Sequence, residues 1–408
     1  MATSHPRRHR LVRAAVAATV APALVAAGDH LPAPSAAAPI SATTALRGLT
    51  SPDHSAAYST LAAQAYARLQ AQLTLAPDQV VWPLSQAVAA TLAASTVPGW
   101  QGPPPNIREA LAVLNPYWDS TAKPGGYGSI QQPPKGLGGP IYYDDNGWIG
   151  LDFVAGHRLT HDSHMLARAR QLFALEKQGW DTSRAHPSPG GVFWTQAPGL
   201  TERNAVSTAV AAQLGLELYL VTGDHGYLDT AKQMFNWVNH TLRAPNGLYG
   251  DHITLTGVVD TTQWSYNQGI MLGAATLLYV ATGDAAYLVQ AQHIADASLQ
   301  LYGANHGFLG QPAIFNAIFF KNLLLLAAVA PNPAYRQALN TYAAELGRTA
   351  PDAPRFGDPT NILDRSARAQ LLAYAATPTR DLRRVWGIPA SAAPIPAQVQ
   401  ITHAGLTS

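Results

Sequence analysis

The chain repeats the stretch Thr222-Gly223-Asp224-His225-Gly226-Tyr227-Leu228 sixty residues later, as Thr282-Gly283-Asp284-Ala285-Ala286-Tyr287-Leu288. A weaker copy, Thr160-His161-Asp162-Ser163-His164-Met165-Leu166, stands sixty-two residues before the first. Self-similarity at a fixed period indicates a supersecondary unit that recurs along the chain. The fold class therefore follows from what this unit is.

Each unit is predicted to be a pair of helices. The segments before the turn are apolar on nearly every face, which predicts buried helices over 205–221, 270–282 and 313–330. The segments after the turn keep apolar residues three to four apart, which is typical of an outer layer, over 227–242, 287–301 and 334–346. Gly223 and Gly283 stand where a helix takes a left-handed cap, and Asp224 and Asp284 can cap the next helix.

Six such pairs arranged in a ring form an (α/α)6 toroid, and we predict this all-α fold. Strand signals are few, and residues 55–387 have room for about six units of this length. An open solenoid is the alternative, but the small number of repeats and the irregular loops favour closure. The long loops that lead into the inner helices should then line one rim, over 98–143, 179–203, 244–266 and 302–312.

The two ends of the chain differ in composition from the rest. A basic start, an apolar run over 14–27 and then small residues and prolines are the features of a secretory signal. We therefore divide the chain into a signal peptide (1–27), a Pro/Ala-rich linker (28–54), the (α/α)6 catalytic domain (55–387) and a flexible C-terminal tail (388–408). An uncleaved membrane anchor is the alternative for the first segment.

Composition narrows the compartment and the function class. Charged residues make up 12% of the chain and the net charge is +2, so a nucleic-acid binder is not expected. The chain has no cysteine, which excludes disulfides, thiolate metal sites and cysteine nucleophiles. A secreted chain without cysteine fits a bacterium. We expect an extracellular bacterial monomer without stable membrane insertion after signal cleavage, with no cofactor and no metal.

The sharpest motif is Tyr142-Tyr143-Asp144-Asp145-Asn146-Gly147-Trp148. Two adjacent carboxylates stand at the start of a predicted inner helix, among aromatic residues. Helix capping is the alternative reading of such a pair. Aromatic faces bind sugar rings, however, and carboxylates carry out acid–base work on glycosidic bonds. Retaining glycosidases need two carboxyl groups about 5–5.5 Å apart, and we expect consecutive residues to meet that distance.

Similar clusters mark the other long loops, and together they predict a sugar-binding cleft on one rim. Trp194 or Trp264 could instead be a core aromatic, and Asn267 and Gln268 could simply cap a helix. We take Asp251, Asn204 and Tyr266 as candidates for binding sugar hydroxyls, and Trp148, Trp194 and Trp264 as candidates for stacking. The remaining candidate substrate-binding residues are Tyr143, Asn267 and Gln268.

The order of these motifs resembles glycoside hydrolase family 76, the bacterial endo-α-1,6-mannanases and their fungal cell-wall transglycosidase relatives. The resemblance covers about residues 55–380 and includes 315–323 and 364–371. It implies an (α/α)6 toroid and retaining hydrolysis of α-1,6-linked mannose in α-mannan. It also implies Asp144 as the nucleophile and Asp145 as the acid/base. The chain departs from the family pattern at Ile149, Arg203, Thr208 and Asn316-Ala317, which puts the substrate subsites in question.

Three other functions remain compatible with the sequence. A transglycosidase would pass the same intermediate to a sugar hydroxyl instead of water. A secreted mannan-binding protein would keep the scaffold without catalysis, although the intact Asp144-Asp145 pair argues against it. An inverting hydrolase would use carboxylates that lie further apart, such as Asp145 and Asp251.

Overall fold

The computed structural model describes residues 55–75, 80–199, 201–348 and 361–389. The predicted signal peptide and linker lie outside these residues, and so does the predicted C-terminal tail from residue 390. Ile388, at the start of that predicted tail, is buried, and its backbone N–H donates to the carbonyl of Arg383 (2.9 Å).

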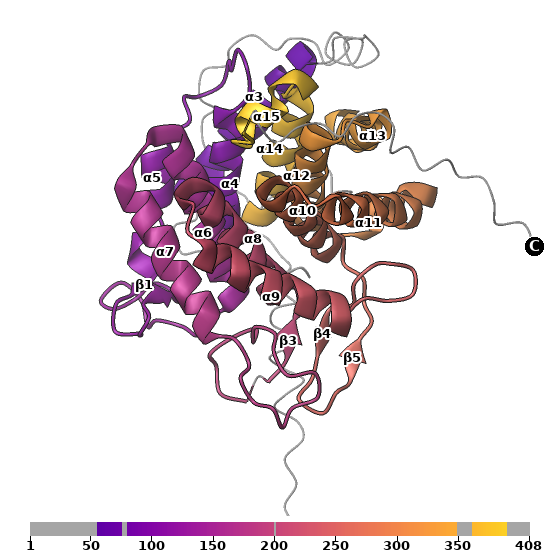
Figure 1. Ribbon diagram of the computed structural model, residues 1–408. Coiled ribbons are helices and arrows are strands. Elements are labelled where there is room, and N and C mark those ends of the chain that lie inside the picture. Colours follow the sequence, from indigo (N-terminus) through magenta and orange to yellow (C-terminus); the bar gives the residue numbers. More distant parts are fainter. Residues whose placement is uncertain (1–54, 76–79, 200, 349–360, 390–408) are drawn as a thin grey trace, which may run out of the picture.

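Among the described residues, six inner helices form a closed ring (Figure 1). Each inner helix contacts the next, and α14 contacts α4, which closes the ring. This closure confirms the predicted (α/α)6 toroid and excludes an open solenoid. The inner helices are α4 (Val81–Ser95), α6 (Tyr143–Thr160), α8 (Ala205–Thr222), α10 (Ser265–Thr282), α12 (Ala313–Val329) and α14 (Ile362–Ala376).

Outer helices cover the ring, and the sixth of them comes from an unexpected place in the sequence. Five follow their inner partner along the chain: α5 (Ile107–Ala112), α7 (Ser163–Gln178), α9 (His225–Thr241), α11 (Ala285–Gly303) and α13 (Pro333–Arg348). The sixth, α3 (Ser55–Leu75), precedes the whole ring and packs on α14. Ser55 Oγ donates to the carbonyl of Ala376 (2.8 Å). The first described helix therefore completes the last pair.

The repeated turn has the caps that the sequence predicts. Gly223 (φ 72°) and Gly283 (φ 71°) are left-handed, and Asp224 and Asp284 each accept from a backbone N–H of the following helix. The weaker copy has the same geometry, although His161 (φ 57°) stands in place of glycine. A further copy, which the sequence comparison missed, follows α12. There Asn332 Oδ1 accepts from Ala334 N (2.9 Å), and no glycine marks the turn.

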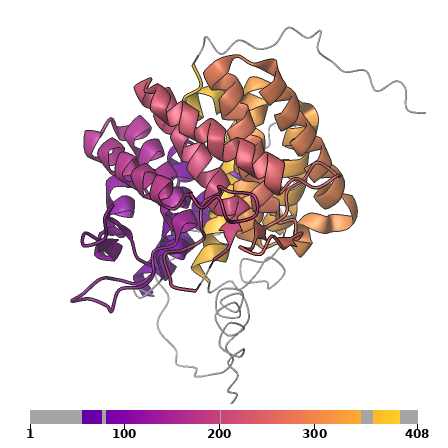
Figure 2. The same ribbon diagram turned by 60° about the horizontal axis from the view of Figure 1, so that its bottom comes forward.

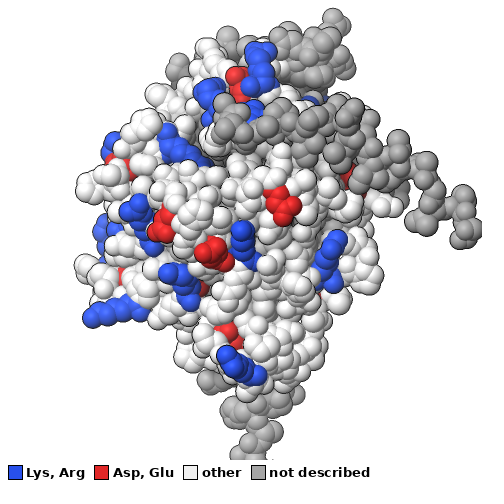
Figure 3. All heavy atoms as spheres, viewed as in Figure 1, with Lys and Arg blue, Asp and Glu red and all other residues white. Residues whose placement is uncertain are grey.

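Helix α8 is long and apolar enough to cross a membrane by length and composition alone. In the structure 78% of its apolar window is buried inside the protein, because it is one of the inner helices of the ring. Its apolar character is therefore explained by the core. On the face seen in Figure 3, basic and acidic side chains are sparse and intermixed, in keeping with the near-neutral charge of the chain.

The loops that lead into the inner helices carry what little strand the described part contains (Figure 2). Strand β1 (Trp118–Asp119) pairs antiparallel with β2 (Gly126–Tyr127). Strands β3 (Arg203–Asn204), β4 (His252–Ile253) and β5 (Val259–Asp260) form an antiparallel sheet in that order. The β3–β4–β5 sheet joins the loops that precede α8 and α10, whereas β1 and β2 belong to the one loop that precedes α6. The remaining short elements are η1 (Asn115–Tyr117), η2 (Ala304–Gly310), η4 (Thr379–Asp381) and α15 (Leu382–Val385).

Candidate active site

The adjacent carboxylates lie in the first turn of α6, at the rim that carries the long loops. Tyr142 occupies the N-cap position and makes no side-chain capping bond, so Asp144 and Asp145 stand inside the helix. The indole Nε1 of Trp194 donates to Asp144 Oδ2 (3.3 Å). In the part of the chain that the structure describes, the buried Oδ1 of Asp144 has no hydrogen-bond partner. A side chain from a loop fifty residues away therefore holds one oxygen of this first-turn carboxylate.

Both carboxyl groups of the pair hold a proton more tightly than an ordinary aspartate. Burial raises the pKa of Asp144 to about 7, against the opposing effect of the Trp194 hydrogen bond. Burial raises the pKa of Asp145 well above its usual value, and the neighbouring charge of Asp144 adds to the effect. Because the indole N–H favours a charged Asp144, the two carboxyl groups of the pair differ in how readily each holds a proton.

A third acidic residue, Glu176, lies behind the pair. It stands in the last turn of α7 and is fully buried. Burial and then the charge of Asp144 raise the pKa of Glu176 well above its usual value. No sequence motif marked this residue, because it lies on an outer helix and not in a long loop.

The structure brings Asp251, Asn267 and Tyr266 to the same place as the pair. Asn267 Nδ2, in the first turn of α10, donates to Asp251 Oδ1 (3.1 Å). The pKa of Tyr266 is raised well above its usual value by burial and then by the charges of Asp251 and Asp144. Elements far apart in the sequence thus place two carboxylates, an amide and a phenol within electrostatic reach of one another.

Aromatic rings surround these polar groups, and one of them, Trp82, was missed by the sequence analysis. Trp194 packs on Tyr142 (5.0 Å between ring centroids), and Trp264 meets Phe315 edge-on (5.6 Å). Tyr266 stacks on Phe315 (4.0 Å, 16° between planes). Trp82 of α4 also approaches Phe315 (6.4 Å). Phe315 begins a segment that the family resemblance had already marked, whereas nothing in the sequence pointed to Trp82.

Several predicted substrate-binding residues are buried: Tyr143, Trp148 and Asn204, and also Asn267 and Gln268. Tyr143 is 5% exposed and packs on Gly179, where a β-carbon would lie 2.6 Å from the ring. Trp148 is 7% exposed, because it lies one turn further into a helix that is buried on most sides. Asn204 is also buried. The structure therefore leaves at most an edge of either ring for stacking on a sugar.

Gln268, one of these predicted substrate-binding residues, is committed to the backbone. Its Oε1 accepts from Tyr249 N (2.8 Å), and its Nε2 donates to the carbonyls of Tyr249 (2.9 Å) and Trp264 (3.1 Å). Asn146 of α6 makes the corresponding bonds to Tyr127 and Tyr142. Both residues stand four positions after the N-cap of their inner helix. We call them the loop latches, because each fixes a long loop to the helix that follows it.

The same position serves a similar purpose in two further inner helices. In α8, Thr208 Oγ1 accepts from Val192 N (2.9 Å). In α12, Asn316 Nδ2 donates to the carbonyl of Phe308 (2.7 Å). Thr208 and Asn316 are two of the departures from the family pattern noted above. In this chain both residues bind loop backbone, so these two departures from the family pattern support the rim.

Replacing Gln268 with Ala should lower stability more than it changes chemistry. The change leaves the N–H and the carbonyl of Tyr249 without their partner inside the protein, at a cost of about 1–3 kcal/mol for each group. We expect a fall of several degrees in the melting temperature, measured by circular dichroism. Gln337→Ala on the exposed face of α13 is the matched control and should melt like the parent. An unchanged melting temperature together with weaker sugar binding would return Gln268 to the substrate-binding set.

Arg203 also supports the rim and does not face a ligand. It is fully buried and pairs with Asp181 (3.0 Å). Its guanidinium also donates to the carbonyls of Pro187, Ser188 and Thr254. A planar guanidinium can satisfy this many acceptors at once, which an ammonium group cannot. Arg203, which departs from the family pattern, therefore joins two loops of the rim.

Replacing Trp194 with Phe should shift the acidic limb of the pH–rate profile. The indole N–H stabilises the charged form of Asp144, so its loss raises the pKa of that carboxyl. Activity needs a charged Asp144. On acidification the variant should therefore lose activity at a higher pH than the parent does. We expect about a tenfold loss of kcat/KM on the acidic side and a smaller loss above the shifted limb.

Trp237→Phe is the matched control for this experiment. It also removes an indole N–H bond, here to the carbonyl of Ser188 (3.1 Å), but it does not touch the pair. A pH profile of Trp194→Phe that falls equally at every pH would mean that Trp194 acts only through packing.

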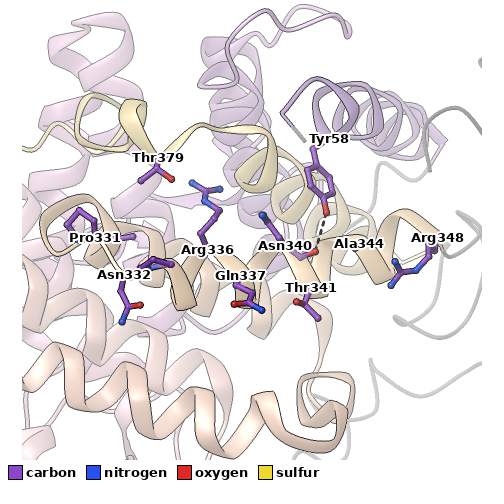
Figure 4. A pocket seen from close by; sticks show the side chains of 12 residues that line it. Tyr58, Pro331, Asn332, Arg336, Gln337, Asn340, Thr341, Ala344, Arg348 and Thr379 are labelled. Carbon is purple, nitrogen blue, oxygen red and sulfur yellow. Dashed lines mark hydrogen bonds between the residues drawn. The ribbon is translucent and has the colours of Figure 1, made fainter. Parts of the chain in front are cut away.

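A cavity of about 750 Å³ lies elsewhere, between α3, α13 and the segment after α14 (Figure 4). Tyr58, Arg336, Asn340 and Thr379 are among the residues that line it. The turn after α12 also borders it, so it opens near the C-terminal ends of the inner helices. Asp144 and Asp145 stand at the N-terminal end of theirs. None of the predicted site residues lines this cavity.

Comparison with known proteins identifies the family. The family model described as glycosyl hydrolase family 76 matches residues 130–353, which is more than half of the chain. The chain belongs to this family. The matched region contains the pair, the loop latches and Arg203. It ends before α14, so the helix pair that closes the ring lies outside it.

Curated relatives carry names that agree with this assignment. The chain is 27% identical over 194 residues to the mannan endo-1,6-alpha-mannosidase DFG5 of Saccharomyces cerevisiae, covering 41% of this chain and 40% of that protein. It is 29% identical over 179 residues to DFG5 of Candida albicans, covering 40% and 39%. The chain thus spans about two fifths of the length of these relatives.

Solved structures of family 76 proteins share the fold. An alpha-mannanase from Bacteroides thetaiotaomicron superposes with a TM-score of 0.67 at 19% identity, covering 78% of this chain and 97% of that one. An inactive variant of an alpha-1,6-mannanase from a Salegentibacter species was solved with alpha-1,6-mannotriose, and it superposes with a TM-score of 0.60 at 19% identity, covering 77% and 99%. The all-α toroid is therefore the fold of family members as well as of this chain.

Proposed function

We propose that this family 76 protein is a secreted glycoside hydrolase that cleaves α-1,6-mannosidic linkages in α-mannan by a retaining double displacement. The observation that carries the proposal is the adjacent Asp144–Asp145 pair, with an indole donor on Asp144 alone. This asymmetry gives two like residues two different protonation states. The curated relatives named as mannan endo-1,6-alpha-mannosidases support the choice of substrate.

In the first step Asp144 attacks the anomeric carbon of an α-linked mannose from the β face. The glycosidic bond breaks as Asp145 gives its proton to the departing oxygen. The product of this step is a β-mannosyl ester of Asp144 and a shortened mannan chain. Two carboxyl groups with separated protonation states are what such a step requires.

In the second step the now charged Asp145 takes a proton from water, and the water oxygen attacks the anomeric carbon. The ester bond to Asp144 breaks and an α-configured sugar leaves. In this proposal Asp251 and Tyr266 bind sugar hydroxyls, and the hydrogen bond from Asn267 holds Asp251. Trp194, Trp264 and Phe315 offer aromatic faces and edges for the sugar rings, in preference to the more deeply buried Trp148.

The inverting alternative is less well supported. It requires Asp251 to act as a base toward water, yet one of its oxygens accepts from Asn267 and the other bonds to His252. Transglycosylation uses the same pair and the same intermediate, and differs only in the acceptor. Secretion, bacterial origin and a monomeric state remain predictions from the sequence.

Digestion of a linear α-1,6-mannan by the purified protein tests the proposal. We expect oligomers of several sizes, with new reducing ends that are first α by proton NMR, because two inversions restore the configuration. A first-formed β product would establish the inverting mechanism. Binding of mannan without any cleavage would leave only the mannan-binding function. Products longer than the substrate would identify a transglycosidase.

A further inference from the structure

His252 is a buried residue of β4 that the proposed mechanism does not use. Its side chain lies between two carboxylates that come from different loops. Its Nδ1 is 3.0 Å from Asp251 Oδ2, and its Nε2 is 3.5 Å from Glu202 Oε2. Asp260, which pairs with it across the β4–β5 ladder, offers a third carboxylate within 4.8 Å. We call these four residues the His252 cluster.

The surroundings of His252 favour an imidazolium ion. An imidazole that faces a carboxylate from each ring nitrogen can donate to both only when both nitrogens carry a hydrogen. Burial alone would lower its pKa. The Asp251 hydrogen bond and the charges of Glu202, Asp251 and Asp260 outweigh burial, so the pKa of His252 is raised. Three acidic groups therefore surround His252 and favour its cationic form.

The cluster is linked to the proposed active site through Asp251. Asn267 holds Oδ1 of this carboxylate, and His252 holds Oδ2. Two donors on different elements therefore fix both oxygens, one from α10 and one from β4. After burial, which is the main cause, the charge of Asp251 adds to the raised pKa values of Asp144 and Tyr266. His252 therefore orients Asp251 through Oδ2, the oxygen that Asn267 does not contact.

We propose that His252 is a positioning residue: as an imidazolium bridging Glu202 and Asp251, it holds the Asp251 carboxylate charged and oriented beside the Asp144–Asp145 pair. The catalytic part of this proposal rests on the proposed function, but the bridge itself does not. Without the imidazolium, Asp251 would keep the hydrogen bond from Asn267. Its negative charge near Asp144 would then lose the positive charge beside it.

A cation-binding role for the same residues is the competing interpretation. Asp251, His252 and Asp260 each offer one potential ligand atom, and these atoms lie within 4.8 Å of one another. A metal ligand must present a free lone pair, however, and an imidazolium has none. The proposal therefore requires the cluster to be indifferent to divalent cations.

NMR tests the bridge without reference to activity. Long-range ¹⁵N spectra of histidine-labelled protein, with the His252 signal assigned by comparison with His252→Gln, should show both ring nitrogens protonated at pH 7. The pKa read from a titration should fall in Glu202→Gln and again in Asp251→Asn. Calcium or zinc, added alone, should leave the signal in place. A neutral ring at pH 7, or a signal that moves on adding either metal, would overturn the proposal.

A double-mutant cycle tests the positioning role. His252→Asn, a neutral replacement, should lower kcat/KM on α-1,6-mannan by about 10- to 100-fold, the scale of one charge-assisted hydrogen bond. In an Asp251→Asn background the same change should cost less than about threefold, because its target is gone. Equal losses in both backgrounds would show that His252 acts independently of Asp251.

Two controls separate folding from positioning. His240→Asn alters an exposed histidine on α9 and should leave kcat/KM unchanged. If His252→Asn melts at a much lower temperature, Glu202→Gln takes its place in the cycle, since it removes the other half of the bridge and lies nearer the surface. Should the parent protein prove inactive on every α-mannan, the proposed function fails while the NMR result still decides the bridge.

Discussion

Asp144→Asn should abolish cleavage of α-1,6-mannan, with a loss of roughly 10⁴- to 10⁶-fold in kcat, the range seen when a nucleophile is removed. The amide keeps the shape of the carboxyl group and can still accept from Trp194 Nε1, but it cannot form the glycosyl ester. The loss should be the same for substrates with good and poor leaving groups, because no intermediate forms with either. Steady-state kinetics on mannan and on an aryl mannoside oligomer measure it.

The matched control is Asp152→Asn, two turns further along the same helix. Asp152 is buried, and burial raises its pKa to about 8, so it is mostly neutral at pH 7 and an amide imitates it. We expect this variant to stay within a few-fold of the parent. If Asp144→Asn keeps full activity and only melts at a lower temperature, the Asp144–Asp145 pair has a structural role in α6 and no catalytic one.

The face of attack by Asp144 can be tested with azide. In Asp144→Ala, azide can occupy the space of the missing carboxylate and displace an activated leaving group from the β face. A single displacement of this kind gives β-mannosyl azide. An α-azide from this variant would mean that another residue had formed the covalent intermediate.

The sequence was sufficient for the fold because the information is periodic. The turn at Gly223-Asp224 recurs at Gly283-Asp284 with the same caps, and helices such as α8 and α12 are apolar on every side, as an inner ring requires. The sixth helix pair, α14 with α3, could not be predicted from the repeat. Its outer helix, α3, lies at the opposite end of the sequence from α14, and no repeat connects the two.

The candidate site was predictable where a motif names the chemistry. Asp144 and Asp251 lie within electrostatic reach of each other, while the catalytic and binding roles of these residues stay predictions. Residue type alone could not separate ligand-binding amides from structural ones. Asn267 and Gln268 are neighbours in the sequence, yet Asn267 turns to Asp251 and Gln268 is consumed by backbone groups of Tyr249 and Trp264.

Glu176 and His252, which lie next to the candidate site residues, carry no motif that marks them in the sequence. Glu176 looks like one more polar residue on an amphipathic outer helix until the structure shows it fully buried near Asp144. His252 is one of fourteen histidines, and only the pairing of β3, β4 and β5 brings Glu202 and Asp260 around it. Burial and partners of this kind depend on tertiary contacts, which a single sequence does not contain.

Asp145→Asn should give a loss that depends on the leaving group. Removing a general acid typically costs about 10²- to 10⁴-fold, and this loss should appear in full on α-1,6-mannan, whose leaving group is a sugar hydroxyl. An aryl mannoside oligomer with a good leaving group needs little protonation, so its first step should remain fast. The β-mannosyl ester on Asp144 should then accumulate, because no base activates water, and mass spectrometry of the trapped protein should detect it.

The pH profile and added azide complete the test of Asp145. The parent loses activity at high pH as Asp145 gives up its proton, and its raised pKa places that limb well above the usual range of a carboxyl group. Asp145→Asn should lack this limb on the aryl substrate, while the acidic limb set by Asp144 remains. Azide needs no base, so it should speed turnover and give the α-azide, since attack on a β-mannosyl ester inverts the configuration a second time. A β-azide from this variant would mean that no ester on Asp144 lies on the pathway.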